Sequence, residues 1–142
     1  GSRFGGHTLF IKNNKLYYVY NFLGITPEQV FESSITLSPG KHTLGMEFIR
    51  KKAGEKGESL GTTKLYIDEE LVAEGPMRTQ PAKFTLSGDG LCIGFDSGDA
   101  VSELYPMPSK FSNGTLDFVG VTVEGTPYRD LELEAKRVMM SQ

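Results

Sequence analysis

Short runs of alternating hydrophobic and polar residues follow one another along most of the chain, and they predict β-strands rather than helices. The first two predicted strands, residues 7–12 and 15–23, flank Asn13-Asn14. Asparagine pairs tolerate the positive φ of a two-residue turn, so these strands are expected to form an antiparallel hairpin. In the second strand every other residue is large and apolar: Leu16, Tyr18, Tyr20 and Phe22. That alternation predicts one face turned to a core.

Further strands are predicted at residues 30–37, 42–50, 62–67, 71–75, 83–86, 91–95, 115–119 and 119–124. Turn-forming residues separate them, including Pro39-Gly40, Asp68-Glu69-Glu70, Asn113-Gly114 and a glycine-rich loop over residues 51–61. About ten strands at this spacing predict an all-β domain. The expected architecture is a two-layer antiparallel β-sandwich or jelly roll of the concanavalin-like type.

Residues 129–140 alone have a helical pattern, with apolar side chains at steps of three and four. A helix of this length is marginal by itself, so it is expected to pack on the β-sandwich, on a second copy or on a further domain. Gly1-Ser2 resemble the remnant that a protease leaves after removing an expression tag. We therefore predict a tail at residues 1–3, a β-sandwich domain at 4–126 and a helical tail at 127–142.

Composition and charge narrow the classes of function. The 142 residues suit one domain, and 38% hydrophobic residues are enough for a core. A net charge of −3 removes the long-range attraction to phosphate, which argues against a nucleic-acid partner. The longest apolar runs have five or six residues, too few to span a bilayer. The compartment is not predicted by any of these features.

Few residues suit direct catalysis. Cys92 lies inside a predicted strand, so we expect a buried core thiol rather than a nucleophile. One cysteine and two histidines do not supply the ligands of a structural zinc site. His7 and His42 begin predicted strands and are interpreted as partly exposed strand-end residues. A Ser-His-Asp arrangement stays open, because triads assemble in space rather than in sequence.

The acidic stretch 94–105 is the main candidate site. Asp96, Asp99 and Glu103 are the oxygen ligands that Ca²⁺ prefers, although their spacing is not that of an EF-hand. The alternative interpretation is a turn in which Asp and Ser side chains cap nearby backbone amides. A sugar site is a third, with Tyr105 or the aromatic face at Tyr17 as a stacking platform.

An ordered set of motifs covers residues 4–124. It starts with Gly5-Gly6 leading to Leu9-Phe10, and then Tyr18-Val19-Tyr20-Asn21. Pro39-Gly40-Lys41-His42 precedes one strand, and Gly61-Thr62-Thr63 another. A Gly94-x-Asp96-x-Gly98-x-x-Val101-Ser102-x-x-Tyr105 stretch and a Phe111-to-Val123 segment follow. Together these motifs resemble the C-terminal domain of a bacterial arylsulfatase family. His7, where the family often has Trp, and the tail after Glu124 depart from the pattern.

The resemblance implies a non-catalytic role. Enzymes of that family hydrolyse sulfate esters in a separate N-terminal domain, where a Cys or Ser of a Cys-x-Pro-x-Arg motif becomes formylglycine and acidic residues hold Ca²⁺. Cys92 is followed by Gly94 and Asp96 where Pro and Arg are required, so no catalytic residue is placed on this chain. The implied partner is the N-terminal sulfatase domain, and a homo-oligomer stays open.

Two hypotheses of different class remain. In the first, the chain is the accessory β-sandwich of an arylsulfatase and supports its catalytic cleft or its oligomer. In the second, the chain is a lectin-like carbohydrate-binding module, with Ca²⁺ as a candidate cofactor at the Asp96–Glu103 loop. An independent hydrolase is the least favoured of the alternatives.

Overall fold

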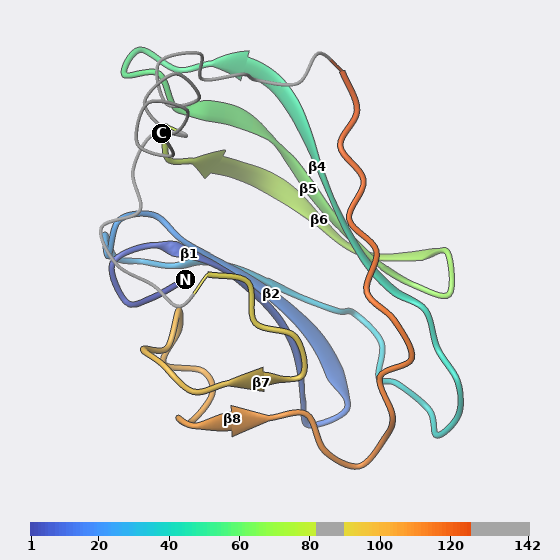
Figure 1. The fold of residues 1–142 in the computed structure, drawn as a ribbon. Coiled ribbons are helices and arrows are strands. Elements are labelled where there is room, and N and C mark those ends of the chain that lie inside the picture. Colours follow the sequence, from blue (N-terminus) through green and yellow to red (C-terminus); the bar gives the residue numbers. More distant parts are fainter. Residues whose placement is uncertain (82–89, 126–142) are drawn as a thin grey trace, which may run out of the picture.

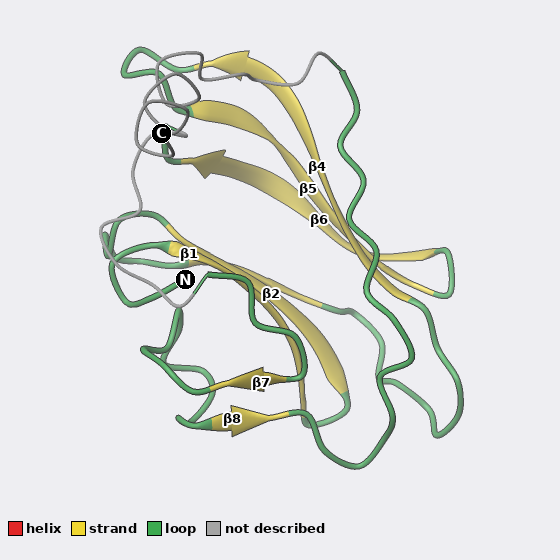
Figure 2. Cartoon of the chain, in the orientation of Figure 1, coloured by secondary structure: helices red, strands yellow, loops and turns green. Residues whose placement is uncertain are grey.

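The computed structural model describes residues 1–81 and 90–125, and this part of the chain is all-β with antiparallel sheets and no helix (Figures 1 and 2). Its strands are β1 (Gly6–Lys12), β2 (Lys15–Asn21), β3 (Gln29–Glu32), β4 (Leu44–Ala53), β5 (Ser59–Ile67), β6 (Glu70–Thr79), β7 (Phe95–Asp96) and β8 (Ser109–Lys110). The predicted strand 83–86 and helix 129–140 lie outside the described residues. No helix able to cross a membrane is found in the described ranges.

The first sheet has the order β1-β2-β3 and confirms the predicted N-terminal hairpin. Lys12 pairs with Lys15, and Asn13 and Asn14 adopt φ values of 51° and 59°. Both central residues of the turn thus have positive φ, as a two-residue hairpin turn requires. The third strand ends at Glu32 rather than near residue 37, because the Ser33 hydroxyl accepts from Leu16 N and donates to Ile35 O, which bends the chain away.

The second sheet has the order β4-β5-β6. Pairing of Ala53 with Ser59 makes β4 and β5 longer than predicted, so the glycine-rich loop shrinks to residues 54–58. The next hairpin turns at Asp68 and Glu69, with φ values of 49° and 71°. The turn predicted there is confirmed.

The main core draws on both three-stranded sheets. Its buried members are Leu16, Tyr18, Tyr20 and Phe31 from the first sheet, and Leu65, Ile67, Val72 and Met77 from the second. The alternation in residues 15–23 therefore identified the face of β2 that packs inward. At one edge the two sheets are joined: Gln29 Nε2 donates to Arg78 O, and Arg78 N donates to Gln29 Oε1, both at 2.8 Å.

The segment after residue 90 differs most from the prediction. Of the predicted strand 91–95 only Phe95 is in a strand, and the predicted strands over 115–124 do not form; Figure 2 draws this stretch as loop. Asn113 has the turn-like φ of 62°, yet no hairpin follows it. The alternating pattern is present there, but no strand within residues 1–81 and 90–125 pairs with the segment. Cys92 is accordingly exposed, so the prediction of a core thiol is wrong.

Candidate functional site

The predicted site segment, residues 94–105, packs on the face of β1 and β2 that lies opposite the main core. Asn21, 4% exposed, fixes it there. Its Nδ2 donates to Val101 O at 2.9 Å and to Arg3 O at 3.1 Å, and its Oδ1 accepts from Gly24 N at 2.7 Å. Lys12 Nζ adds a bond to Leu104 O at 2.8 Å. One buried amide thus joins three separate parts of the chain.

Two of the predicted site residues, Tyr17 and Tyr105, both contact the ring of Phe10. Phe10 stacks on Tyr17 with centroids 5.4 Å apart and planes at 8°, and it contacts Tyr105 at 5.1 Å. We call Phe10, Tyr17 and Tyr105 the aromatic cluster; all three are half-buried. Phe10 was not singled out from the sequence, although the Asn13-Asn14 turn places it directly opposite Tyr17.

The hydroxyl of Tyr105 connects the aromatic cluster to the acidic stretch. It donates to Asp96 Oδ2 at 3.0 Å and accepts from Val101 N at 3.2 Å. Burial is the main cause that raises the pKa of Tyr105, so the hydroxyl keeps its proton at neutral pH and remains a donor.

The remaining predicted ligands do not converge with Asp96. Arg3 donates to Asp99 through Nη2 at 2.6 Å, through Nε at 2.9 Å and through its backbone N at 3.1 Å. These bonds lower the pKa of Asp99 and hold it as a carboxylate. Glu103 is exposed. Within residues 1–81 and 90–125, no group of three or more His, Cys, Asp or Glu side chains is arranged to hold a metal ion.

Serine capping occurs in this stretch, as one of the alternative interpretations expected. Ser102 Oγ accepts from Leu104 N at 3.2 Å and donates to Glu28 Oε2 at 2.6 Å. The aspartates behave differently from that interpretation: Asp99 binds Arg3, and Asp96 binds Tyr105. The stretch is therefore held to the body of the domain by long-range bonds as well as by its own turns.

A Ser-His-Asp arrangement does assemble, at Ser38, His42 and Asp68. His42 Nδ1 lies 2.5 Å from Asp68 Oδ2, and His42 Nε2 lies 2.8 Å from Ser38 O and 3.4 Å from Ser38 Oγ. A carboxylate and a carbonyl only accept hydrogen bonds, so two acceptors face the two ring nitrogens and this arrangement favours the protonated imidazole. His42 Nε2 lies closer to the Ser38 carbonyl than to the Ser38 hydroxyl, so the ring is not placed to take a proton from that hydroxyl as in a catalytic triad. We call the His42 contacts with Asp68 and Ser38 the clamp, because they link two turns.

The clamp predicts a pH dependence of stability. Its hydrogen bond to Asp68 raises the pKa of His42 above 6.5, and the same bond lowers the pKa of Asp68 below 3.8. The His42 contribution is complete below pH 6.5 and is lost as the pH rises through its folded value. The Asp68 contribution is complete above pH 3.8 and is lost as the pH falls through its folded value. Stabilisation by the clamp is therefore expected to be greatest between these two pH values.

NMR titration of the two histidine rings measures this effect. We expect His42 to titrate above pH 6.5 in the wild-type chain and at a lower pH in Asp68→Asn, which keeps the shape but removes the charge. His7, which contacts the Tyr18 ring at 5.9 Å, is the internal reference and should titrate unchanged. An Asp68→Asn variant with an unshifted His42 would contradict the clamp.

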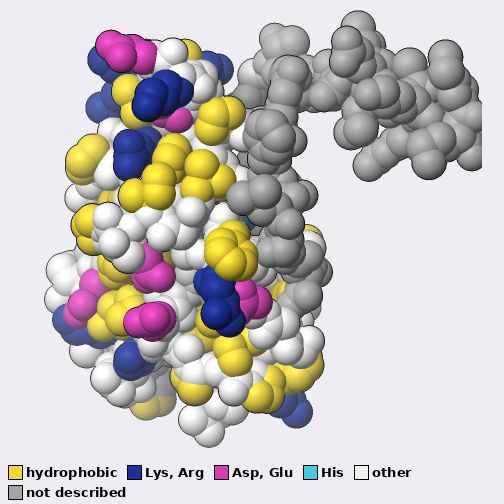
Figure 3. All heavy atoms as spheres, turned by 90° about the vertical axis from the view of Figure 1, so that its left-hand side faces the viewer, with side chains coloured by type: hydrophobic (Ala, Val, Ile, Leu, Met, Phe, Trp, Pro, Cys, Tyr) yellow, Lys and Arg dark blue, Asp and Glu magenta, His cyan; other side chains and the backbone are white. Residues whose placement is uncertain are grey.

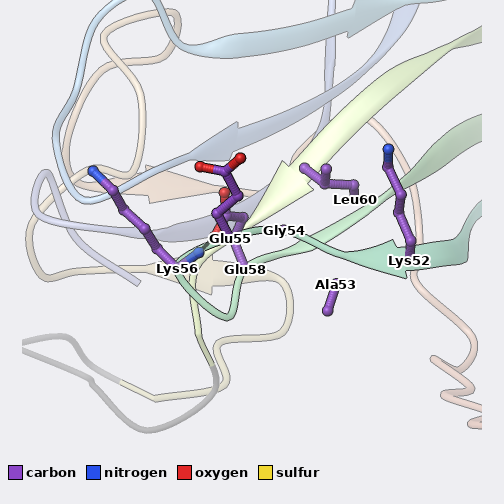
Figure 4. Close-up of a pocket in the computed structure, with 7 residues that line it drawn as sticks. All are labelled: Lys52, Ala53, Gly54, Glu55, Lys56, Glu58 and Leu60. Carbon is purple, nitrogen blue, oxygen red and sulfur yellow. Dashed lines mark hydrogen bonds between the residues drawn. The ribbon is translucent and has the colours of Figure 1, made fainter.

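Two hollows among the described residues are shallow and lie away from the aromatic cluster. One, of about 350 Å³, lies at the β4–β5 hairpin, where Lys52 and Lys56 stand at opposite ends of the lining residues (Figure 4). The other, of about 380 Å³, is lined by residues of β5 and β6 together with Gln29. On the face shown in Figure 3, hydrophobic side chains lie among charges of both signs. Neither hollow gathers a set of groups suited to catalysis.

These features were compared with known proteins in three ways. A search of protein-family models, a search of curated proteins and a search of solved structures each found no match to this chain.

Proposed function

We propose that this chain is a non-catalytic accessory domain of an arylsulfatase-type enzyme, built as a β-sandwich or jelly roll. The observation that carries the proposal is an exposed apolar patch formed after residue 90. We call it the loop patch: Leu91, Ile93, Phe95, Phe111 and Leu116, each at least 39% exposed. Apolar surfaces of this kind mark protein–protein contacts, and here they offer a surface on which a catalytic domain docks.

The loop patch is held as a unit. Phe111 N donates to Gly94 O at 2.8 Å, and β7 pairs with β8, so residues 91–95 and 109–111 lie together. The Leu116 side chain lies beside Gly94: a Cβ atom added to that glycine would be 3.9 Å from Leu116 Cδ2. The ordered motifs over residues 4–124 suggest the partner, an N-terminal sulfatase domain that carries formylglycine and Ca²⁺. The reaction itself is assigned to that partner.

The coding sequence upstream of Arg3 gives the first test. We expect a sulfatase domain there with a Cys-x-Pro-x-Arg or Ser-x-Pro-x-Arg motif, and its absence would refute the proposal. In the whole enzyme, the double variant Leu91→Lys/Phe95→Lys should loosen the contact between the domains and lower the turnover of a chromogenic aryl sulfate. Leu71→Lys, which changes an exposed leucine of β6, is the control and should leave turnover unchanged.

The aromatic cluster favours a second function, carbohydrate binding. Phe10, Tyr17 and Tyr105 present half-buried ring surface beside the Asp96 carboxylate, a combination of apolar surface and hydrogen-bonding groups that suits a sugar. A glycan array with and without Ca²⁺ tests it. Binding that is lost in Tyr17→Ala but kept in Tyr66→Ala, a tyrosine on the other sheet, would support this function. An array without signal would exclude it.

A further inference from the structure

Strand β4 has an open hydrogen-bonding edge. In the order β4-β5-β6, β5 covers one edge of β4, and no strand of the described ranges covers the other. The opposite edge of the sheet is different, because β6 is linked there to β3 through Gln29 and Arg78. An unpaired edge presents a row of backbone N–H and C=O groups to which another strand can add.

Residues 117–124 have the properties of a strand without a partner. Phe118, Val121 and Val123 are 81%, 77% and 82% exposed, and no residue of the segment belongs to a strand. The sequence Asp-Phe-Val-Gly-Val-Thr-Val-Glu has high β-propensity, and valines occupy every second position from Val119 to Val123. We call these residues the open segment. Such exposure is costly in water unless another surface covers it.

The charges of the open segment and of the β4 edge are complementary. The segment carries a carboxylate at each end, Asp117 and Glu124. The C-terminal end of β4 carries three basic residues, Arg50, Lys51 and Lys52, and Lys41 lies shortly before the strand. Basic residues on an edge strand discourage indiscriminate pairing, and they favour an added strand that bears carboxylates.

We propose that the open segment of one copy adds antiparallel to the β4 edge of a second copy of this chain, forming a twofold dimer. The register that fits places Asp117 opposite Arg50 of the other copy. It sets the three valines opposite apolar residues that pack only partly against the core: Phe48, Met46 and Leu44. It also sets Phe118 opposite Ile49, which is 39% exposed on the other face of β4. Apolar pairs across both faces are what stabilise an added strand.

The chain's own geometry favours a second copy over closure within one chain. Lys41 Nζ pairs with Asp117 Oδ2 at 3.0 Å, which places the start of the open segment near the start of β4. From there the segment runs in the same direction as its own β4 (Figure 1). Antiparallel pairing is the more stable arrangement per residue, and a twofold axis supplies it twice. The inference does not depend on the arylsulfatase resemblance.

Sedimentation equilibrium of the full chain tests the dimer. We expect a concentration-dependent mass that approaches twice 15.6 kDa. Val121→Lys puts a cation in the proposed contact and should weaken dimerisation at least ~10-fold. Leu71→Lys is the matched control, since Leu71 is 46% exposed on β6 and lies outside both the open segment and β4; it should dimerise normally. Circular dichroism checks that each variant is folded. A monomer at every concentration, or a dimer insensitive to Val121→Lys, would overturn the proposal.

A cross-link tests the register. In a Cys92→Ser background, which removes the exposed thiol, Gly45→Cys and Thr122→Cys lie opposite each other in the proposed pairing. Position 45 accepts a side chain, because a Cβ atom added to Gly45 would be 3.8 Å from its nearest neighbour, Tyr66 Cβ, which is ordinary van der Waals contact. Oxidation should give a disulfide-linked dimer on a non-reducing gel. A disulfide within one chain would show instead that the segment closes on its own β4, and that result would refute the second copy.

Discussion

Leu65→Ala is expected to lower the free energy of unfolding by about 2–5 kcal/mol. Leu65 lies on β5, the central strand of its sheet, and its side chain is fully buried among core residues of both sheets. Truncation to alanine removes one methine and two methyl carbons that are buried, and it leaves a cavity that a central strand cannot easily collapse to fill. Chemical denaturation monitored by circular dichroism measures the change.

The matched control is Leu71→Ala. Leu71 is on β6 in the same sheet but is 46% exposed, so its truncation should change the free energy of unfolding far less than that of Leu65. Equal losses in the two variants would contradict the burial of Leu65 in a core shared by the two three-stranded sheets.

Asn21→Ala is expected to be the second most damaging single change. Its amide is the only described side chain that bonds to Arg3, Gly24 and Val101 together, and the alanine variant leaves those backbone groups without their partner. Each buried polar group left unsatisfied costs about 1–3 kcal/mol. We also expect faster hydrogen exchange across residues 96–105, because their attachment to β2 is lost. Unchanged exchange there would contradict the anchoring role of Asn21.

Asn21→Asp sharpens this test. The introduced carboxylate keeps the shape but faces the carbonyl oxygens of Arg3 and Val101, which it cannot donate to when ionised. Burial and these carbonyls raise the pKa of the introduced carboxyl in the folded state, so the variant should regain stability as the pH falls and the group is protonated. Urea midpoints at neutral and acidic pH, compared with those of the wild type, measure the recovery.

The N-terminal half of the fold was predictable because its signals are local. Asn13-Asn14 specify a turn by their tolerance of positive φ, and the alternation from Leu16 to Tyr20 then indicates which face of β2 joins the main core. After residue 90 the same kind of pattern misled. Residues 115–124 alternate as well as β2 does, yet a strand needs a neighbour, and a sequence pattern does not reveal whether one is present.

The candidate site was predictable only in part. Tyr17, Asp96 and Tyr105 are linked through contacts with Phe10 and the Tyr105 hydroxyl. The pairing of Asp99 with Arg3 joins residues 96 positions apart, and no spacing rule anticipates it. Likewise the His42–Asp68 contact depends on how a hairpin turn approaches the start of β4. The sequence showed which ionisable and aromatic side chains the chain contains. Which of them come into contact depends on the long-range arrangement of the fold.

The pair of hydrogen bonds between Gln29 and Arg78 has a consequence for how the two sheets part. The side-chain amide of Gln29 imitates a peptide group, donating to the carbonyl and accepting from the N–H of one residue on β6. At this edge, strands β3 and β6 are therefore linked by a rotatable side chain rather than by a continuous ladder of backbone hydrogen bonds. A single rotamer change of Gln29 releases both bonds at once, so exchange of the Arg78 amide proton becomes a local probe of the link between β3 and β6, separate from global unfolding.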